Sequence, residues 1–408
     1  MLLLVTLLFA AAANGGVAPV VGPEIASTPI RTFAGFPNAA LSPHLVQPAA
    51  PLATDGDGFV IAFTALSDDG KARTTVMRLD SQAYAVAGTA RELPATQPYY
   101  DAVDPDVVAA PNGFYVAQTE LSPLSSRVVV WHLDRALRPD ALPVSIVPTE
   151  KGIGSAIVPP GLVRVAGNRV AVVTDHAVVD YDLAGAPLRT TPLPFAPDDA
   201  VFASGALVAG GVDSAPDVQL CGFRFPCATV PQHFNVFLSF DGTFPPQARY
   251  SSFYTNDRIA LATDGSTLFY FFDKYFKQPG LGGGYMSFLR FEAVHGGAID
   301  VEPRTVATFN AIDGDIAARP SAAFDGTRFL IVWRTAANER HAVGAAAIER
   351  DGTVTLIDIP NLADETLPFV VAAGPNRFLV SYLTRSGDVH RIAGRFITFG
   401  GRRPVVKR

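Results

Sequence analysis

Acidic side chains gather in the short polar segments that separate the apolar runs of this chain. They are Asp101, Asp104, Asp198, Asp199, Asp257, Asp313, Asp315, Asp364 and Glu365, and Arg258 and Arg319 lie among them. Grouped carboxylates can hold a hard cation or a cationic ligand, and together with arginines they can grip sugar hydroxyl groups. Loops are also polar simply because water surrounds them, so a solvated surface stays open beside the predicted ligand site.

Aromatic residues occupy two of the same segments. They are Tyr99, Tyr100, Phe253 and Tyr254. A tyrosine ring has an apolar body and a polar tip, so an exposed ring can stack on a sugar or contact a peptide. The alternative is that these rings fill the centre of the molecule.

The other chemistry-bearing residues fit no catalytic or cofactor motif. The seven histidines are scattered and form no pair at metal-ligand spacing. The glycine run at residues 280–284 lacks the Lys and the Ser or Thr of a phosphate-binding loop. Asp55 and Asp57 lack the further oxygen ligands of an EF-hand. The sequence therefore predicts no metal site and no cofactor, and it assigns no catalytic residue.

The composition argues against a nucleic-acid partner. The formal net charge is -6 at pH 7, and the four basic residues after position 401 are too few to form the basic patch that such binding requires. Charged residues make up only 17% of the chain, with 35 Gly and 33 Pro. These values are typical of many buried strands joined by turns.

The N-terminal residues predict export. Residues 1–13 form an apolar run closed by three alanines, which matches a signal peptide, although no Lys or Arg precedes the run. We therefore expect a secreted or periplasmic protein. No apolar run reaches the roughly 18 residues of a membrane span. In an exported chain, Cys221 and Cys227 are expected to form a disulfide bond.

One short pattern recurs seven times along the chain. It consists of a small apolar run, a turn built on Gly or Asn, and a run of aromatic or aliphatic residues. The second run begins at Phe59, Phe114, Val170, Leu207, Leu268, Phe329 and Phe378. Repeats of roughly 40 to 60 residues indicate one repeat-built domain, so we assign residues 14–399 to a single domain and residues 400–408 to a C-terminal tail.

The pattern predicts an all-β fold in which each repeat supplies four short strands. The first strand has small residues that suit a crowded axis, as at residues 107–110, and the second is apolar on both faces, as at residues 329–333. We therefore predict a seven-bladed β-propeller of four-stranded blades. The last repeat is one strand short, and residues 25–33 are predicted to supply that strand and close the ring.

The segment Ala323 to Trp333 reads Ala-x-Asp-Gly-x-x-Phe-Leu-x-Val-Trp. This pattern resembles uncharacterised secreted bacterial β-propeller repeat proteins over roughly residues 51–399. The resemblance implies the fold but no catalytic residues. The chain lacks the Gly-His to Trp-Asp signature of one propeller family, and Asp325-Gly326-Thr327 is not the Asp-box of sialidases.

The longest loops are predicted on one face, which favours binding there because loops on a rigid scaffold carry function. We expect an exported, non-enzymatic binding scaffold whose partner is a glycan, a peptide or another surface protein. The alternative is a glycosidase or lyase with a carboxylate pair about 5 to 10 Å apart. A structural part of a cell-surface assembly would instead expose an apolar patch on the blade edges.

Overall fold

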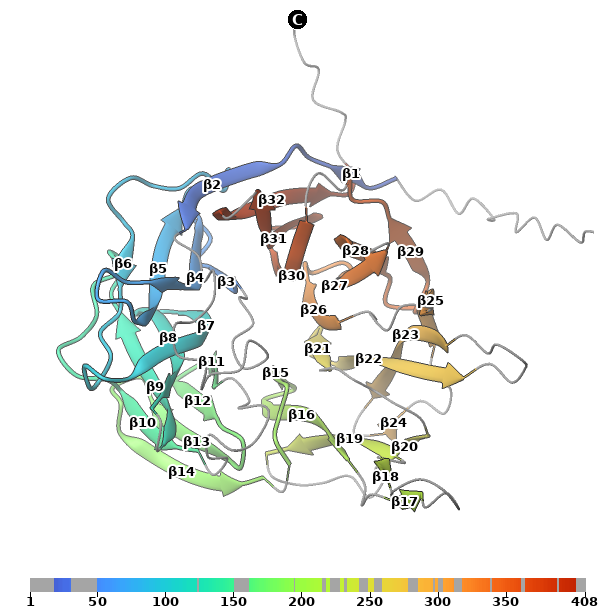
Figure 1. Ribbon diagram of the computed structural model, residues 1–408, viewed down its shortest axis with the longest axis horizontal. Coiled ribbons are helices and arrows are strands. Elements are labelled where there is room, and N and C mark those ends of the chain that lie inside the picture. Colours follow the sequence, from blue (N-terminus) through green and yellow to red (C-terminus); the bar gives the residue numbers. More distant parts are fainter. Residues whose placement is uncertain are drawn as a thin grey trace, which may run out of the picture.

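All regular elements that the structure describes are β-strands (Figure 1). The computed structural model describes residues 18–30, 50–122, 125–149, 161–193, 195–214, 218–220, 228–230, 233–241, 249–252, 259–277, 285–295, 298–299, 304–311, 318–337, 340–360, 364–386 and 389–400. Within these ranges the strands form seven antiparallel sheets of four or five strands, numbered here in chain order, and one separate two-stranded sheet.

The first four sheets follow one another along the chain. Sheet 1 contains β3 (Leu52–Thr54), β4 (Phe59–Leu66), β5 (Ala72–Leu79) and β6 (Arg91–Glu92). Sheet 2 contains β7 (Asp101–Ala110), β8 (Gly113–Leu121), β9 (Ser126–Leu133) and β10 (Ser145–Pro148). Sheet 3 contains β11 (Leu162–Ala166), β12 (Arg169–Val173), β13 (Ala177–Asp182) and β14 (Pro187–Pro192). Sheet 4 contains β15 (Asp199–Ala203), β16 (Ala206–Ser214), β19 (His233–Phe240) and β20 (Arg249–Ser252), and β17 (Val218–Leu220) pairs with β18 (Ala228–Val230) between β16 and β19.

The last three sheets continue the pattern. Sheet 5 contains β21 (Ala260–Thr263), β22 (Thr267–Lys277), β23 (Tyr285–His295), β24 (Ala298–Ile299) and β25 (Arg304–Ala311). Sheet 6 contains β26 (Ala318–Phe324), β27 (Phe329–Ala337), β28 (Arg340–Ile348) and β29 (Val354–Ile357). Sheet 7 contains β30 (Asp364–Ala372), β31 (Arg377–Ser386) and β32 (Val389–Thr398), with β1 (Val20–Val21) and β2 (Ile25–Ile30) both paired to β32.

The sheets stand around a common centre with their first strands innermost (Figure 1). Each first strand contacts the first strand of the next sheet, and β30 of the last sheet contacts β3 of the first. Small side chains such as Ala53, Ala200 and Ala260 are buried on these strands, as the sequence predicts. The molecule is therefore an all-β protein with a β-propeller fold.

Each second strand is buried on both faces because a sheet packs against each of them. On β8, Phe114 and Val116 enter the apolar core shared with sheet 1, whereas Tyr115 and Ala117 enter the core shared with sheet 3. Alternate residues of a strand point to opposite faces, so a continuous apolar run is what this position requires.

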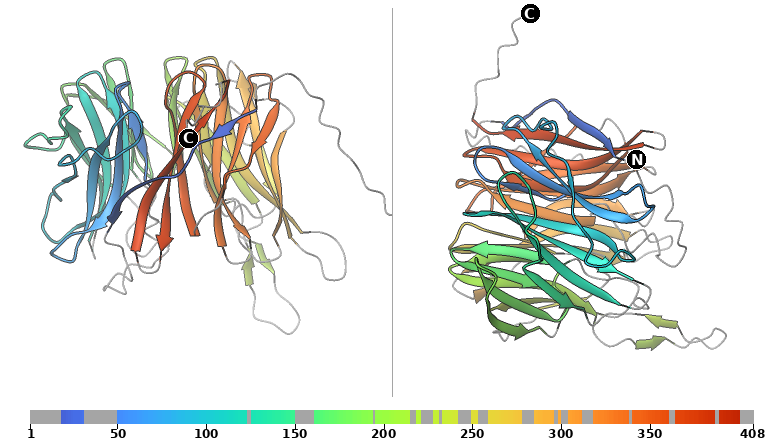
Figure 2. Two further views of the ribbon diagram at one scale, coloured as in Figure 1. Left: turned by 90° about the horizontal axis from the view of Figure 1, so that it is seen from above. Right: turned by 90° about the vertical axis from the view of Figure 1, so that its left-hand side faces the viewer.

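The strand order gives the molecule two unlike sides. Turns between first and second strands, and between third and fourth strands, lie at one end of the sheets, which we call the turn side. Loops between second and third strands, and the segments that join successive sheets, lie at the opposite end, which we call the connector side. Figure 2 shows the strands running between these two ends.

The N-terminal strand β2 lies beside the last strand of the chain. Ile25 pairs with Gly394 and Ile30 pairs with His390. Arg395 is buried next to this segment and donates to the Gly22 carbonyl (3.2 Å) and to the Glu24 carboxylate (3.3 Å). Of the residues 25–33 predicted to form this strand, those after residue 30 lie outside the described ranges.

The first strands of three sheets begin earlier than the sequence predicts. Register shifts fall at Pro105 in β7, at Pro320 in β26 and at Pro368 in β30. Proline lacks an N–H donor and so suggests the end of a strand, but a bulge allows pairing to continue on its far side. The prediction that these charged residues lie in connecting loops is therefore wrong for Asp101, Asp104, Arg319, Asp364 and Glu365. It is also wrong for Asp199, which is the first residue of β15.

Candidate functional site

The segment that joins sheet 1 to sheet 2 carries two stacked tyrosines on the connector side. The rings of Tyr99 and Tyr100 are 4.9 Å apart between centroids and 28° from parallel. Tyr99 is 57% exposed, whereas Tyr100 is only 6% exposed. Of the two interpretations of these rings, exposure for ligand contact fits Tyr99, whereas Tyr100 is covered by the Arg127 guanidinium and the Tyr99 ring.

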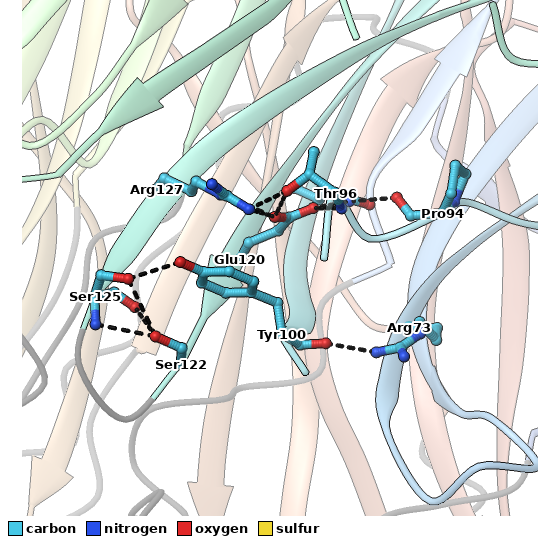
Figure 3. A network of polar contacts seen from close by, with 9 residues as sticks. Arg73, Pro94, Thr96, Tyr100, Glu120, Ser122, Ser125 and Arg127 are labelled. Atoms are coloured by element: carbon cyan, nitrogen blue, oxygen red, sulfur yellow. Dashed lines mark hydrogen bonds and ion pairs between the residues drawn. The ribbon is translucent and has the colours of Figure 1, made fainter. Parts of the chain in front are cut away.

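Four contacts hold Tyr100 in place, and Figure 3 shows those with Ser125 and Arg73 as dashed lines. The Arg127 guanidinium lies over its ring at 4.2 Å from the centroid, and its hydroxyl is 2.7 Å from Oγ of Ser125. Its carbonyl accepts a hydrogen bond from Nη1 of Arg73 (2.6 Å), and its N–H donates to the Gln97 carbonyl (3.2 Å). Tyr100 is therefore a fixed base for the Tyr99 ring.

A buried glutamate positions Arg127. Glu120 is fully buried, and its Oε2 accepts from Nε of Arg127 at 3.0 Å. Its Oε1 accepts from the N–H of Thr96 (2.7 Å) and from Nε2 of Gln118 (3.2 Å). The Thr96 hydroxyl contacts both Glu120 and Arg127 (Figure 3). Because a buried charge needs a partner and hydrogen bonds, this network fixes the connecting segment as well as Arg127.

The predicted acids of this region are engaged within the protein. Oδ1 of buried Asp101 accepts from the Ala72 N–H at 2.9 Å. Asp104 is also buried and adopts φ = 47°, a conformation that an Asp tolerates in the bulge of β7. Arg73 beside them donates to Oδ2 of Asp69 at 2.9 Å. The hydrogen bond between Asp101 of β7 and Ala72 of β5 ties sheet 2 to sheet 1.

A second charged cluster lies on the innermost strands. Arg164 of β11 contacts Asp106 of β7 and donates to Oδ1 of Asp199 of β15 (2.8 Å), so it joins three successive sheets. Burial raises the pKa of Asp199, although Arg164 and two backbone N–H groups oppose that rise. Burial lowers the pKa of Arg164, but the charges of Asp106 and Asp199 outweigh burial and raise it.

The Arg164 cluster is occupied by internal contacts. Arg164 also donates to the carbonyls of Ala200 (2.5 Å) and Val163 (2.8 Å), while Asp106 accepts from the Val163 N–H (2.9 Å). Asp199 likewise accepts from the Leu261 N–H (2.8 Å) of the next sheet. Saturated in this way, the cluster holds the inner strands together.

The structure places only part of the predicted site. It brings Tyr99, Tyr100 and Asp101 together at one connector, with Asp104 further along β7. The side chains of Arg319, Asp364 and Glu365 are not described, and the remaining predicted residues lie outside the described ranges: Tyr254, Asp257, Arg258, Asp313, Asp315, Cys221 and Cys227. Among the described residues no group of three or more His, Cys, Asp or Glu side chains is placed to hold a metal ion.

The residues that support the tyrosine stack were not predicted as site residues. Glu120 could have been found, because it follows Phe114, Val116 and Gln118 on the same face of β8 and that face is buried. A charged residue on a buried face requires a charged or polar partner. Nothing in the sequence spacing identifies Arg127 as that partner.

Comparisons with known proteins find similar solved structures, a WD40 domain among them. No protein-family model matches the chain, and no curated protein matches it. Similar solved structures include a protein of unknown function from Dyadobacter fermentans, with 15% identity, a TM-score of 0.43 and coverage of 94% of this chain and 100% of that chain. The PQQ-bound aldose sugar dehydrogenase of Streptomyces coelicolor is 15% identical, with a TM-score of 0.41 and coverage of 93% of this chain and 100% of that chain. The Pan2 WD40 domain of Neurospora crassa is 8% identical, with a TM-score of 0.45 and coverage of 92% of this chain and 95% of that chain. At these values the fold assignment rests on the sheet arrangement itself.

In the part of the chain that the structure describes, no helix has the length and apolar character needed to cross a membrane.

Proposed function

We propose that this protein is an exported, non-enzymatic binding scaffold that uses the connector side. The observation that carries the proposal is the Tyr99 ring, which is 57% exposed and stacked on an anchored second ring. A ring fixed before binding loses little conformational freedom when a ligand stacks on it.

The charged residues around the stack support binding rather than catalysis. Asp101 accepts from a backbone N–H, and Glu120 is fully buried against Arg127. A glycosidase needs two carboxyl groups that face the substrate. Neither of these carboxylates is placed to reach one, so chemistry on a bound glycan would have to come from other acids.

We also propose the finer features of the fold on which this scaffold depends. The seven sheets act as seven blades of one domain spanning residues 14–399, and β2 closes the ring by pairing with β32. In this proposal residues 1–13 are removed on export. The inner-strand contact of β3 with β30 supports the closed ring.

The test is a binding screen on arrays of glycans, peptides and cell-surface proteins. We expect a ligand that binds the parent protein and is lost in Tyr99→Ala. The matched control is Tyr84→Ala, because Tyr84 is 58% exposed but lies in a turn-side hairpin. Mass spectrometry of the recovered ligand should find it unaltered. Cleavage of the ligand, or binding that survives Tyr99→Ala, would contradict the proposal.

A further inference from the structure

We infer that the Tyr99 stack binds a neutral saccharide, with one pyranose ring lying on the exposed face of Tyr99. The inference rests on the proposed function and narrows its ligand class. A tyrosine ring has an electron-rich face that attracts weakly positive groups. The C–H face of a pyranose is such a group, and its hydroxyls need polar neighbours at the rim.

The distribution of exposed apolar side chains favours a saccharide over a protein partner. Protein interfaces gather several aromatic and aliphatic residues in one patch. Among the described residues, the other large exposed apolar side chains lie in turn-side hairpins or on outer strands: Tyr84, Val86, Leu142, Ile146, Leu188 and Leu356. Tyr99 therefore stands alone on the described connector side, which suits a ligand with a single apolar face.

Polar groups border the stack. Asp69 lies in the connector-side loop of sheet 1 and is half exposed, with Oδ2 held by Arg73. On the sheet 2 side, Oγ of Ser125 is 2.7 Å from the Tyr100 hydroxyl. Asp69 is connected to Tyr100 through Arg73, and Ser125 contacts the Tyr100 hydroxyl directly. Carboxylate and hydroxyl groups of this kind can accept from and donate to sugar hydroxyls.

The charges at the site favour a neutral ligand. Both arginines near the stack are paired with carboxylates, Arg127 with Glu120 at 3.0 Å and Arg73 with Asp69 at 2.9 Å. An acidic saccharide would need a cation free to meet its charge, and it would also approach a chain of net charge -6. A neutral sugar needs no free cation and is not repelled by the negative net charge of the chain.

The experiment titrates the full chain with cellohexaose, laminarihexaose and maltohexaose by calorimetry, with a hexasaccharide of galacturonic acid as the acidic comparison. We expect at least one neutral hexasaccharide to bind. Tyr99→Ala should weaken that binding by about tenfold or more, because it removes the ring face on which the pyranose lies. Tyr99→Trp should retain binding, and the control Tyr84→Ala should leave it unchanged.

Three outcomes would overturn the inference. The first is the absence of neutral saccharide binding at millimolar concentration, and the second is equal binding by parent and Tyr99→Ala. The third is preference for the acidic hexasaccharide. In the first of these cases, a peptide from a synthetic library whose binding is lost in Tyr99→Ala would show that the proposed binding role stands without the saccharide assignment. If Tyr99→Ala changes neither saccharide binding nor peptide binding, both the saccharide assignment and the proposed binding role fail.

Discussion

The turn side and the connector side are both polar, yet their polar residues are used differently. On the turn side, Asp55 pairs with Arg78 of its own sheet (2.8 Å) and with Arg135 of the next sheet (3.6 Å). Asp264 of sheet 5 pairs with Arg350 of sheet 6 (3.2 Å) in the same manner. These ion pairs connect the turns of neighbouring sheets, so the turn-side acids hold the fold together.

The described connector side instead uses its ion pairs to present a ring. Glu120 and Arg127 are placed beneath Tyr100, and Tyr99 stacks on Tyr100 toward solvent. Carboxylate-rich loops are therefore weak evidence for a ligand-binding site, since most of the described acids on either side have internal partners. An exposed ring with a buried support is the stronger evidence.

The greatest loss of stability is expected when the support beneath Tyr100 is altered at Glu120. Glu120→Gln should lower the free energy of unfolding by about 3 kcal/mol, because it removes the fully buried carboxylate that pairs with the partly buried Arg127. Chemical unfolding measures the change. The control is Glu349→Gln, which removes an exposed turn-side partner of Arg328 and should cost less than about 0.5 kcal/mol. Equal losses of unfolding free energy in the two variants would contradict the distinct structural role assigned to Glu120.

A turn-side acid should matter for stability alone. Asp55→Asn should cost about 1 to 2 kcal/mol, since the Asp55 side chain is buried and accepts from Arg78 and from the Asp57 N–H. Ligand binding should stay at the parent value. Asp57→Asn in the same turn is the control, because Asp57 is exposed. A loss of binding in Asp55→Asn would mean that the two sides are not separate in function.

The anchor of the stack can be weakened without removing a ring. Tyr100→Phe removes the hydroxyl that meets Ser125 and should cost about 1 kcal/mol of stability. Binding should weaken only a few-fold, since the base ring and Arg127 remain. Calorimetry with the saccharide panel measures this, and complete loss of binding would show that the hydroxyl contacts the ligand itself.

The free energy of unfolding should depend on pH with opposite signs for Asp241 on the turn side and for Asp199 in the Arg164 cluster. Burial raises the pKa of Asp241, but hydrogen bonds from Arg169 and the Leu207 N–H outweigh it, so the pKa lies below its usual value. A lowered pKa stabilises the folded state above about pH 4, and this contribution disappears as the pH falls through the folded value. The raised pKa of Asp199 acts the other way, because the folded state then binds its proton more readily than the unfolded chain.

Urea unfolding at pH 6 and at pH 3 tests whether Asp241 on the turn side stabilises the folded state more at the higher pH. The stability difference between the parent and Asp241→Asn should shrink at pH 3, because the contribution of the ionised carboxylate disappears as the pH falls below the usual Asp pKa. This is the smallest of the expected effects. A difference that is constant across this range would mean that Asp241 is not held as the carboxylate by Arg169.

Much of the fold could be predicted from the sequence, because it follows from local patterns. The second strands begin within one residue of the predicted positions, as at Phe59 and at Gly113, since the turn before each run has its own residue signature. The early starts of β7, β26 and β30 were missed because proline marks a strand end locally, while the bulge depends on the neighbouring strand.

The site was less predictable because it depends on contacts between distant residues. Tyr99 and Asp101 were identified by type and position, but burial decides their roles. Only the packed sheets determine that Tyr100 is covered, that Asp101 accepts from Ala72 and that Glu120 meets Arg127.

The most direct measurement compares binding and unfolding of Tyr99→Ala and Asp55→Asn in the same buffer. We predict that Tyr99→Ala loses ligand binding by about tenfold or more while its unfolding free energy stays within about 0.5 kcal/mol of the parent. Asp55→Asn should bind like the parent and unfold more easily. If Tyr99→Ala instead lowers stability and keeps binding, the exposed ring serves the fold and the assignment of the connector side to binding is wrong.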